Sequence, residues 1–193
     1  MLRAVLSLLL LLSFQSVVRA DSAVAVFAGG CFWCVESLYQ ELEGVTDAVS
    51  GFTGGTVENP SYQGRHDGHY EAVRVTYDPA AVSFRELLDV YWRNIDPFDN
   101  RGQFCDKGPS YRSAIFVANA QERALAEASK SAVEQQFPDH TVYTEILDGA
   151  RFWPVEEGHQ DYFRKNPVRY KYYRWNCGRD QRLEAIWGAA GDH

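Results

Sequence analysis

The order of predicted strands and helices restricts this chain to few folds. Apolar side chains recur every second residue in strands and every third or fourth residue in helices. On this basis we expect strands at 23–28, 45–52, 70–77, 113–118 and 141–147, and helices at 31–43, 83–95 and 119–136. The first six elements have the order β-α-β-β-α-β, which is typical of a split, ferredoxin-like unit. We therefore predict an α+β, two-layer sandwich with helices on one face of a mixed sheet.

The remaining segments are expected to be less regular. A polar, glycine-rich loop is predicted at 54–68, and a loop of this length in a compact domain is usually functional or mobile. The C-terminal tail from Arg151 onward is aromatic and basic, and we expect it to be irregular apart from short helical pieces at 159–165 and 180–187. No repeat or linker divides the chain, so residues 21–193 are expected to form one domain.

Residues 1–20 have the pattern of a secretory signal peptide. Arg3 precedes the apolar run Leu8–Leu12, and Val18-Arg19-Ala20 forms a small-residue cleavage site. The run is short for a membrane span, so a cleaved leader is favoured over an anchor. The mature protein would begin at Asp21 and be exported, as a periplasmic or secreted protein.

Charge and composition limit the partners of the mature protein. Without the leader, 17 basic residues face 26 acidic ones, and a charge of −9 argues against nucleic acid or anionic membrane as the main partner. The only methionine is Met1, which suits a protein that works among oxidants, because oxidation of thioethers damages cores and interfaces. We expect a monomer.

Four cysteines carry the main chemical signal. An even number in an exported protein suggests structural disulfides, but Cys31 and Cys34 lie only three residues apart. Cys31 follows Gly29-Gly30 at a strand–helix junction, where unpaired N–H groups and the helix dipole favour a thiolate. Cys34, one turn later, could attack an oxidised Cys31 and close a disulfide. A zinc site is disfavoured because Cys105 and Cys177 are isolated from each other in the sequence.

The string Gly30-Cys31-Phe32-Trp33-Cys34-Val35-Glu36 resembles the active-site signature of the A-type peptide methionine sulfoxide reductases. Five further motifs are similar to those of the family, in the same order along the chain. They are Gly51–Gly55 with Phe52 for the usual tyrosine, Asn59–Tyr62, Gly68–Val73, Asp106–Ser113, and Glu156–Tyr162 with a shift at Val155. Many ordered matches are more specific than any one of them.

The resemblance implies a reaction and a set of roles. Methionine sulfoxide, free or in oxidised proteins, would be attacked by Cys31, which becomes a sulfenic acid. Glu71 would be the proton donor, provided that an apolar setting holds its proton. The other implied roles are hydroxyls on the sulfoxide oxygen from Tyr62 and Tyr111, an orienting carboxylate from Asp106, and a wall for the substrate methyl group from Phe32 and Trp33. Nothing in the sequence requires a metal or an organic cofactor.

The resemblance leaves the second half of the cycle open. A resolving thiol would convert the sulfenic acid into a disulfide, which a thioredoxin-type reductant would reduce. The order of preference is Cys177 in the tail, then Cys34, then Cys105. Many family members have glycine where Cys34 stands, and a helical i,i+3 pair must distort to form a disulfide. The stretch between Tyr62 and Glu71 is also shorter than the family pattern.

The residues given these roles also have alternative interpretations. Glu71 on an alternating strand could be a solvated carboxylate, and Tyr62 and Tyr111 could be ordinary half-buried tyrosines. His159 and Gln160 are expected to be structural and to cap or bridge segments of the tail. Two other functions compete with the reductase: a general thiol–disulfide oxidoreductase that uses Cys31 and Cys34, and a non-catalytic binding domain stapled by disulfides.

Overall fold

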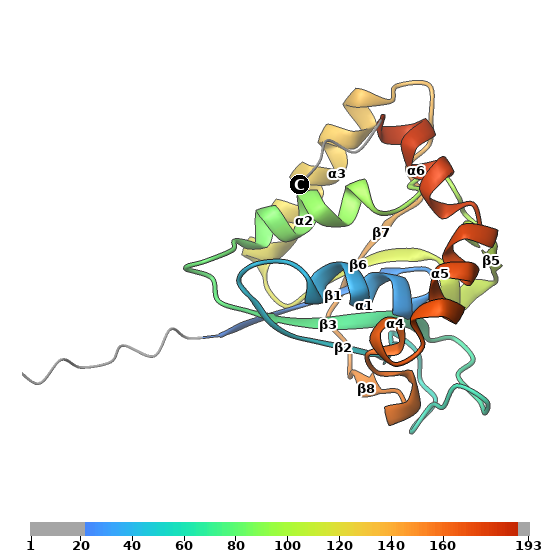
Figure 1. Ribbon diagram of the computed structural model, residues 1–193. Coiled ribbons are helices and arrows are strands. Elements are labelled where there is room, and N and C mark those ends of the chain that lie inside the picture. The colour runs from blue at the N-terminus through green and yellow to red at the C-terminus, as the bar shows by residue number, and fades with distance from the viewer. Residues whose placement is uncertain (1–21, 189–193) are drawn as a thin grey trace, which may run out of the picture.

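A six-stranded sheet with the strand order β7-β6-β1-β3-β2-β8 forms the centre of the protein in the computed structural model, which describes residues 22–188 (Figure 1). Its four central strands are β6 (Ser113–Val117), β1 (Ala23–Gly29), β3 (Tyr70–Tyr77) and β2 (Val45–Thr53). Each is antiparallel to its neighbour among these four, and β7 (Glu145–Asp148) is parallel to β6. The α+β class, the ferredoxin-like core and the mixed sheet predicted from the sequence are confirmed.

The helices α1 (Phe32–Gln40), α2 (Phe84–Arg93) and α3 (Ala120–Gln136) cover one face of this sheet. Because side chains alternate along a strand, Phe27, Val73 and Ile115 point into the core beneath these helices. Ala28, Ala72 and other side chains between them form a smaller apolar cluster on the opposite face. The main core therefore lies between the sheet and the helices, as expected for two layers.

Helix ends agree with the capping signals in the sequence. Ser83 and Glu86 form a capping box at the start of α2, and the Asn119 side chain accepts a hydrogen bond from the Glu122 N–H at the start of α3. Among the sheet and the helices that cover it, the largest differences from expectation are the end of α1 at Gln40, three residues earlier than predicted, and the start of β7 at Glu145, four residues later.

The tail contains more helix than the sequence indicated. After the short strand β8 (Trp153–Pro154), which pairs with β2, it forms the 3₁₀ turn η2 (Glu157–His159) and the helices α4 (Tyr162–Lys165), α5 (Pro167–Asn176) and α6 (Arg179–Trp187). Helix α5 was not predicted. It begins with Pro167 at a first-turn position, where the missing N–H of proline costs no helical hydrogen bond.

Three smaller elements complete the described chain: β4 (Gly102–Gln103), β5 (Asp106–Lys107) and the 3₁₀ turn η1 (Pro109–Tyr111). The predicted loop 54–68 contains no helix or strand and is tied to β3 by His69, which hydrogen bonds with Gly55 N (3.3 Å) and Val57 O (2.8 Å). Within residues 22–188, no helix is both long and apolar enough to span a bilayer. The predicted leader, residues 1–20, lies outside the described residues.

Candidate active site

Cys31 lies at the turn between β1 and α1. Gly30 has a φ of +84°, which side chains disfavour, and a β-carbon there would lie 2.5 Å from Cβ of Gln103. The backbone conformation and the lack of space both require glycine at this turn. Cys31 itself is the N-cap of α1, with φ −54° and ψ 118°, and its side chain makes no capping hydrogen bond. The residue is 6% exposed. The backbone thus places Cys31 at the N-terminus of α1 in a buried position.

Glu71 approaches the same helix N-terminus from β3. Its Oε2 accepts a hydrogen bond from the Phe32 N–H at 3.1 Å, and the residue is only 2% exposed. Burial raises the pKa of Glu71 to about 8, the charges of Asp106 and Cys34 raise it further, and the hydrogen bonds from Phe32 and Tyr111 oppose the rise. Glu71 is therefore mostly protonated at neutral pH, so its alternative interpretation as a solvated carboxylate is wrong.

Two tyrosine hydroxyls and a carboxyl group lie around this acid. Burial, and next the charge of Glu71, raise the pKa of Tyr62 to about 12, and the same two causes raise the pKa of Tyr111. Both hydroxyls consequently keep their protons and can donate hydrogen bonds at neutral pH. Burial also raises the pKa of Asp106, which accepts a hydrogen bond from the Tyr173 hydroxyl.

The tail forms an aromatic wall around the site. The ring of Trp33 stacks on Tyr162 at a centroid distance of 3.8 Å and lies parallel to the ring of His159 at 5.7 Å. His159 in turn contacts Tyr62 at 4.1 Å. Trp33 is partly exposed, whereas Phe32 is fully buried beneath it and packs edge-on against Phe52. Of the two predicted wall residues, only Trp33 reaches the surface.

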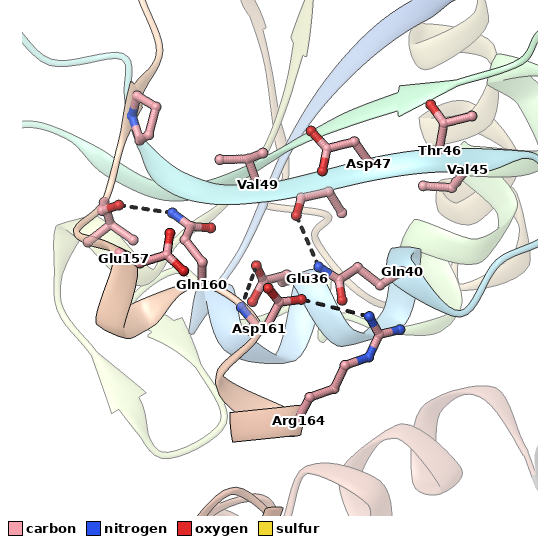
Figure 2. Close-up of a pocket in the computed structure, with 13 residues that line it drawn as sticks. Glu36, Gln40, Val45, Thr46, Asp47, Val49, Glu157, Gln160, Asp161 and Arg164 are labelled. Carbon is pink, nitrogen blue, oxygen red and sulfur yellow. Dashed lines mark hydrogen bonds and ion pairs between the residues drawn. The ribbon is translucent and has the colours of Figure 1, made fainter. Parts of the chain in front are cut away.

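Glu36, Gln160 and Asp161 join the segment that carries His159 and Tyr162 to α1 and β2 (Figure 2). The Gln160 amide bonds to Ser50 O and Val155 O, both at 2.9 Å, and the Asp161 N–H donates to Glu36 Oε1 at 3.1 Å. Burial raises the pKa of Glu36 to about 7. The expected bridging role of Gln160 is confirmed, while His159 also belongs to the aromatic wall.

Cys34 lies beside Cys31, and both are buried free thiols. The hydrogen bond from Cys31 lowers the pKa of Cys34 to about 6, and the positive charges of Arg179 and Arg174 act in the same direction. Burial raises the pKa of Cys31, and its neighbours Cys34 and Glu71 raise it further. Burial and the neighbouring Cys34 and Glu71 thus oppose the lowering of the Cys31 pKa that the helix N-terminus is expected to give, and the two thiols titrate as a pair.

The other two cysteines form a disulfide. Cys105 and Cys177 are 72 residues apart in sequence, and their Cα atoms are 4.9 Å apart. Their sulfur atoms lie within 4.8 Å of a carboxylate oxygen of Asp106. Asp106 is joined through the Tyr173 hydroxyl to Cys31, with which that hydroxyl also hydrogen bonds. The disulfide is therefore separated from the Cys31 sulfur by two hydrogen-bonded side chains.

Comparison with known proteins identifies this arrangement. A family model described as peptide methionine sulfoxide reductase matches residues 23–190. The chain belongs to the peptide methionine sulfoxide reductase family. MsrA 2 of Caulobacter vibrioides is 50% identical over 167 residues, which cover 85% of each chain. The solved structure of methionine sulfoxide reductase A of Corynebacterium diphtheriae has a TM-score of 0.69 at 32% identity and covers 78% of each chain.

A more distant solved structure shares the fold. Mxr1 of Saccharomyces cerevisiae, solved in complex with Trx2, has a TM-score of 0.55 at 21% identity, over 78% of this chain and 91% of that chain. The family and the relatives together make the present protein an oxidoreductase of the A type, a peptide-methionine (S)-S-oxide reductase. The alternatives of a general thiol–disulfide oxidoreductase and a stapled binding domain are set aside.

The reductase site thus brings together the five residues predicted to be catalytic: Cys31, Glu71, Tyr62, Tyr111 and Asp106. The sequence prediction missed the residues that the tail contributes. Tyr173 contacts both Cys31 and Asp106, Tyr162 covers Trp33, and the buried Arg179 faces Cys34 and Asp106. Tyr170, Tyr173 and Cys177 recur at helical spacing, but Val168, Tyr172 and Trp175 do so too, and the spacing alone does not indicate which of the two faces is buried.

Proposed function

We propose that the enzyme reduces methionine-S-sulfoxide by direct attack of the Cys31 sulfur on the substrate sulfur, in the repair of oxidised proteins. The observation that carries the proposal is the buried, protonated Glu71 held at the same helix N-terminus as Cys31. A sulfoxide sulfur becomes electrophilic only when its oxygen is protonated or strongly hydrogen bonded. Glu71 supplies the proton, while the hydroxyls of Tyr62 and Tyr111 hold the oxygen.

The first step transfers the sulfoxide oxygen to Cys31 and needs no reactant besides the substrate and the enzyme. The Cys31 thiol passes its proton to the Cys34 thiolate as its sulfur attacks, and Glu71 gives its proton to the sulfoxide oxygen. The attack forms a bond between the two sulfurs, and this bond breaks again as the oxygen moves to Cys31. The substrate sulfur–oxygen bond is lost, a Cys31 sulfur–oxygen bond forms, and Cys31 becomes a sulfenic acid. The products are methionine, the sulfenic acid, a neutral Cys34 thiol and an ionised Glu71, so the substrate sulfur gains two electrons and Cys31 loses two.

The second step forms the first disulfide. The contact between the two sulfurs supports Cys34 as the thiol that attacks the Cys31 sulfenic acid and releases water. Because Cys31 is an N-cap and not a residue of the helix interior, the pair is not held at a helical i,i+3 spacing. Thiol–disulfide exchange then transfers the oxidation to Cys105 and Cys177. This order puts Cys34 ahead of Cys177, the reverse of the preference drawn from the sequence.

A thioredoxin-type reductant would complete the cycle. Cys105 is exposed, so the Cys105–Cys177 disulfide is accessible to a protein thiol, while Cys31 and Cys34 are buried. The complex of yeast Mxr1 with Trx2 supports such a partner. Two electrons from the dithiol of the reductant restore both enzyme thiols, and the sum of the steps is one sulfoxide and one dithiol converted to one sulfide, one disulfide and water.

A single-turnover experiment tests this sequence of disulfides. Fully reduced enzyme without external reductant is expected to form two sulfides per chain, since four thiols supply the electrons for two sulfoxides. With limiting sulfoxide and rapid acid quench, mass spectrometry should find Cys31–Cys34 first and Cys105–Cys177 later. Cys34→Ser should stop after one sulfide, with a Cys31 sulfenic acid that dimedone traps. A Cys31–Cys177 bridge in wild type and full turnover by Cys34→Ser would contradict Cys34 as the resolving thiol.

We also propose that the protein is exported to the periplasm or secreted. The charge at Arg3, the apolar run Leu8–Leu12 and the cleavage pattern ending at Ala20 support this. Mass analysis of the protein recovered from the producing cells is expected to give a mature N-terminus at Asp21. Recovery of the intact chain in the cytoplasm would contradict export.

A further inference from the structure

Helix α5 carries an apolar stripe on the side that faces away from the protein. Val168, Tyr172 and Trp175 are 82%, 65% and 66% exposed, and their spacing of four and three residues places them on one helix face. Tyr170 and Tyr173, on the opposite face, pack against Cys34 and Trp33. The stripe therefore takes no part in the core, and large exposed apolar side chains that gather on one face mark an interaction site.

The C-terminal end of this stripe lies near the disulfide that the reductant must reach, although Cys177 itself is on the helix face of Tyr170 and Tyr173. Helix α5 has Cys177 as its C-cap, two residues after Trp175, and β5, which follows Cys105, lies beside α5 (Figure 1). Cys177 also lines a surface hollow with Phe98 and Phe104. Any protein that brings a cysteine sulfur into contact with this disulfide must cover the neighbouring surface.

Positive charges border the stripe on both sides. Arg169 and Lys171 are exposed and lie to either side of the line from Val168 to Trp175, and within residues 22–188 neither forms an ion pair. The next cation of the helix, Arg174, is instead bound by Asp180. The whole chain has a net charge of −7, so the positive charge of Arg169 and Lys171 is opposite in sign to that of the protein as a whole. Such a border is complementary to carboxylates of a partner.

We propose that the outer face of α5, formed by Val168, Tyr172 and Trp175 with its basic border, is the docking surface for the protein reductant. The expected partner is a thioredoxin-type dithiol protein whose attacking cysteine lies in an apolar surface edged by carboxylates. This inference rests on the proposed function. An oxidised protein substrate depends on this surface less than the reductant does. It has only to insert one flexible methionine sulfoxide side chain past Trp33 to reach Cys31.

A reductant bound at the docking surface would reduce the Cys105–Cys177 disulfide by thiol–disulfide exchange. A thiolate of the reductant attacks one sulfur of the Cys105–Cys177 disulfide, the sulfur–sulfur bond breaks, and the displaced cysteine leaves as a thiolate. The second thiol of the reductant then attacks the mixed disulfide and releases the other enzyme cysteine. The reductant leaves as a disulfide, and the enzyme has gained two electrons. Aromatic residues beside a reactive centre are typical hot spots of such transient contacts.

The test compares two reductants in the full-length enzyme. Trp175→Glu is expected to lower kcat/KM at least tenfold when purified thioredoxin, recycled by thioredoxin reductase and NADPH, supplies the electrons. With dithiothreitol the rate should not change, because a small thiol needs no docking surface. Val24→Glu is the matched control, since Val24 is also an exposed apolar residue (45%) but lies at the start of β1, on the side of the sheet away from α5 (Figure 1), and it should change neither rate. Trp175→Phe should keep most of the thioredoxin-driven rate.

Several results would overturn the docking surface while the proposed function stands. These are an unchanged thioredoxin-driven kcat/KM in Trp175→Glu, an equal loss with both reductants, or a raised KM for an oxidised protein substrate with dithiothreitol. A wild-type dimer in analytical ultracentrifugation that Trp175→Glu dissociates would assign the stripe to a second copy of the chain. Failure of the proposed function looks different, because wild type would then release no sulfide even with dithiothreitol.

Discussion

Cys31→Ser is expected to lose all measurable reduction of methionine-S-sulfoxide, both with dithiothreitol and with a protein reductant. A serine hydroxyl is far less acidic and less nucleophilic than a thiol, and it cannot take the oxygen as a sulfenic acid. The substitution is nearly isosteric at a residue that is 6% exposed, so folding should be preserved. The measurement is sulfide formed per chain by chromatography, together with the thermal melt of each variant.

The matched control is Cys34→Ser, one turn away in the same buried pair. With dithiothreitol this variant should still turn over, because a small thiol can reduce the Cys31 sulfenic acid directly. Its rate should be lower than that of wild type, since Cys34 no longer accepts the proton of Cys31. Equal and complete loss in both variants would mean that the pair acts as one unit and that Cys31 alone is not the nucleophile. Full turnover by Cys31→Ser would exclude it from the chemistry.

Local patterns in the sequence were sufficient to predict five of the six strands of the sheet and the three helices that cover it, but not β8. The alternation at 23–28 and 70–77 and the capping residues Ser83 and Asn119 depend on near neighbours in the chain, and the structure reproduces these elements within a few residues. The strand–turn–helix junction around Cys31 is local in the same sense. Its glycines and the helical spacing after it are visible without knowledge of the fold.

Helix α5 could not be predicted in this way. Its aromatic residues lie on both faces, with Tyr170 and Tyr173 inward and Tyr172 and Trp175 outward, so no single apolar side appears in the sequence. Only packing against Cys34 and Trp33 determines which face is buried. For this reason the residues of the site that come from the tail were missed.

The electrostatics of the thiols also depend on distant parts of the chain. The position of Cys31 at a helix start predicts a lowered pKa, but the tail and β3 bury it and bring Glu71 beside it. Arg179, from the start of α6, supplies one of the charges that stabilise the Cys34 thiolate. The pairing of Cys105 with Cys177 likewise depends on how α5 packs beside the β4–β5 segment, which is set by tertiary structure.

Glu71→Gln is expected to lower the single-turnover rate of sulfoxide reduction by about 10²- to 10⁴-fold, the usual contribution of a general acid. Glutamine can still accept the hydrogen bond from Phe32 N, so the turn at Cys31 should keep its geometry, but it has no acidic proton to donate. Alkylation of Cys31 by iodoacetamide at neutral pH should be as fast as in wild type, because a neutral amide replaces a carboxyl group that is mostly protonated. An unchanged turnover rate would refute the role of Glu71 as proton donor.

The pH profile separates a proton donor from a merely structural carboxyl group. The pKa of Glu71 is raised to about 8, so the acid is present below that pH and is lost as the pH rises through it. For the attack, the Cys31–Cys34 pair must carry one negative charge. The pKa of Cys34 is about 6, so activity should fall as the pH drops below about 6. Wild type should therefore show a bell-shaped single-turnover profile with its maximum between about pH 6 and 8. Glu71→Gln should keep the acid limb and lose the alkaline one; an alkaline limb that persists in this variant would assign it to another group.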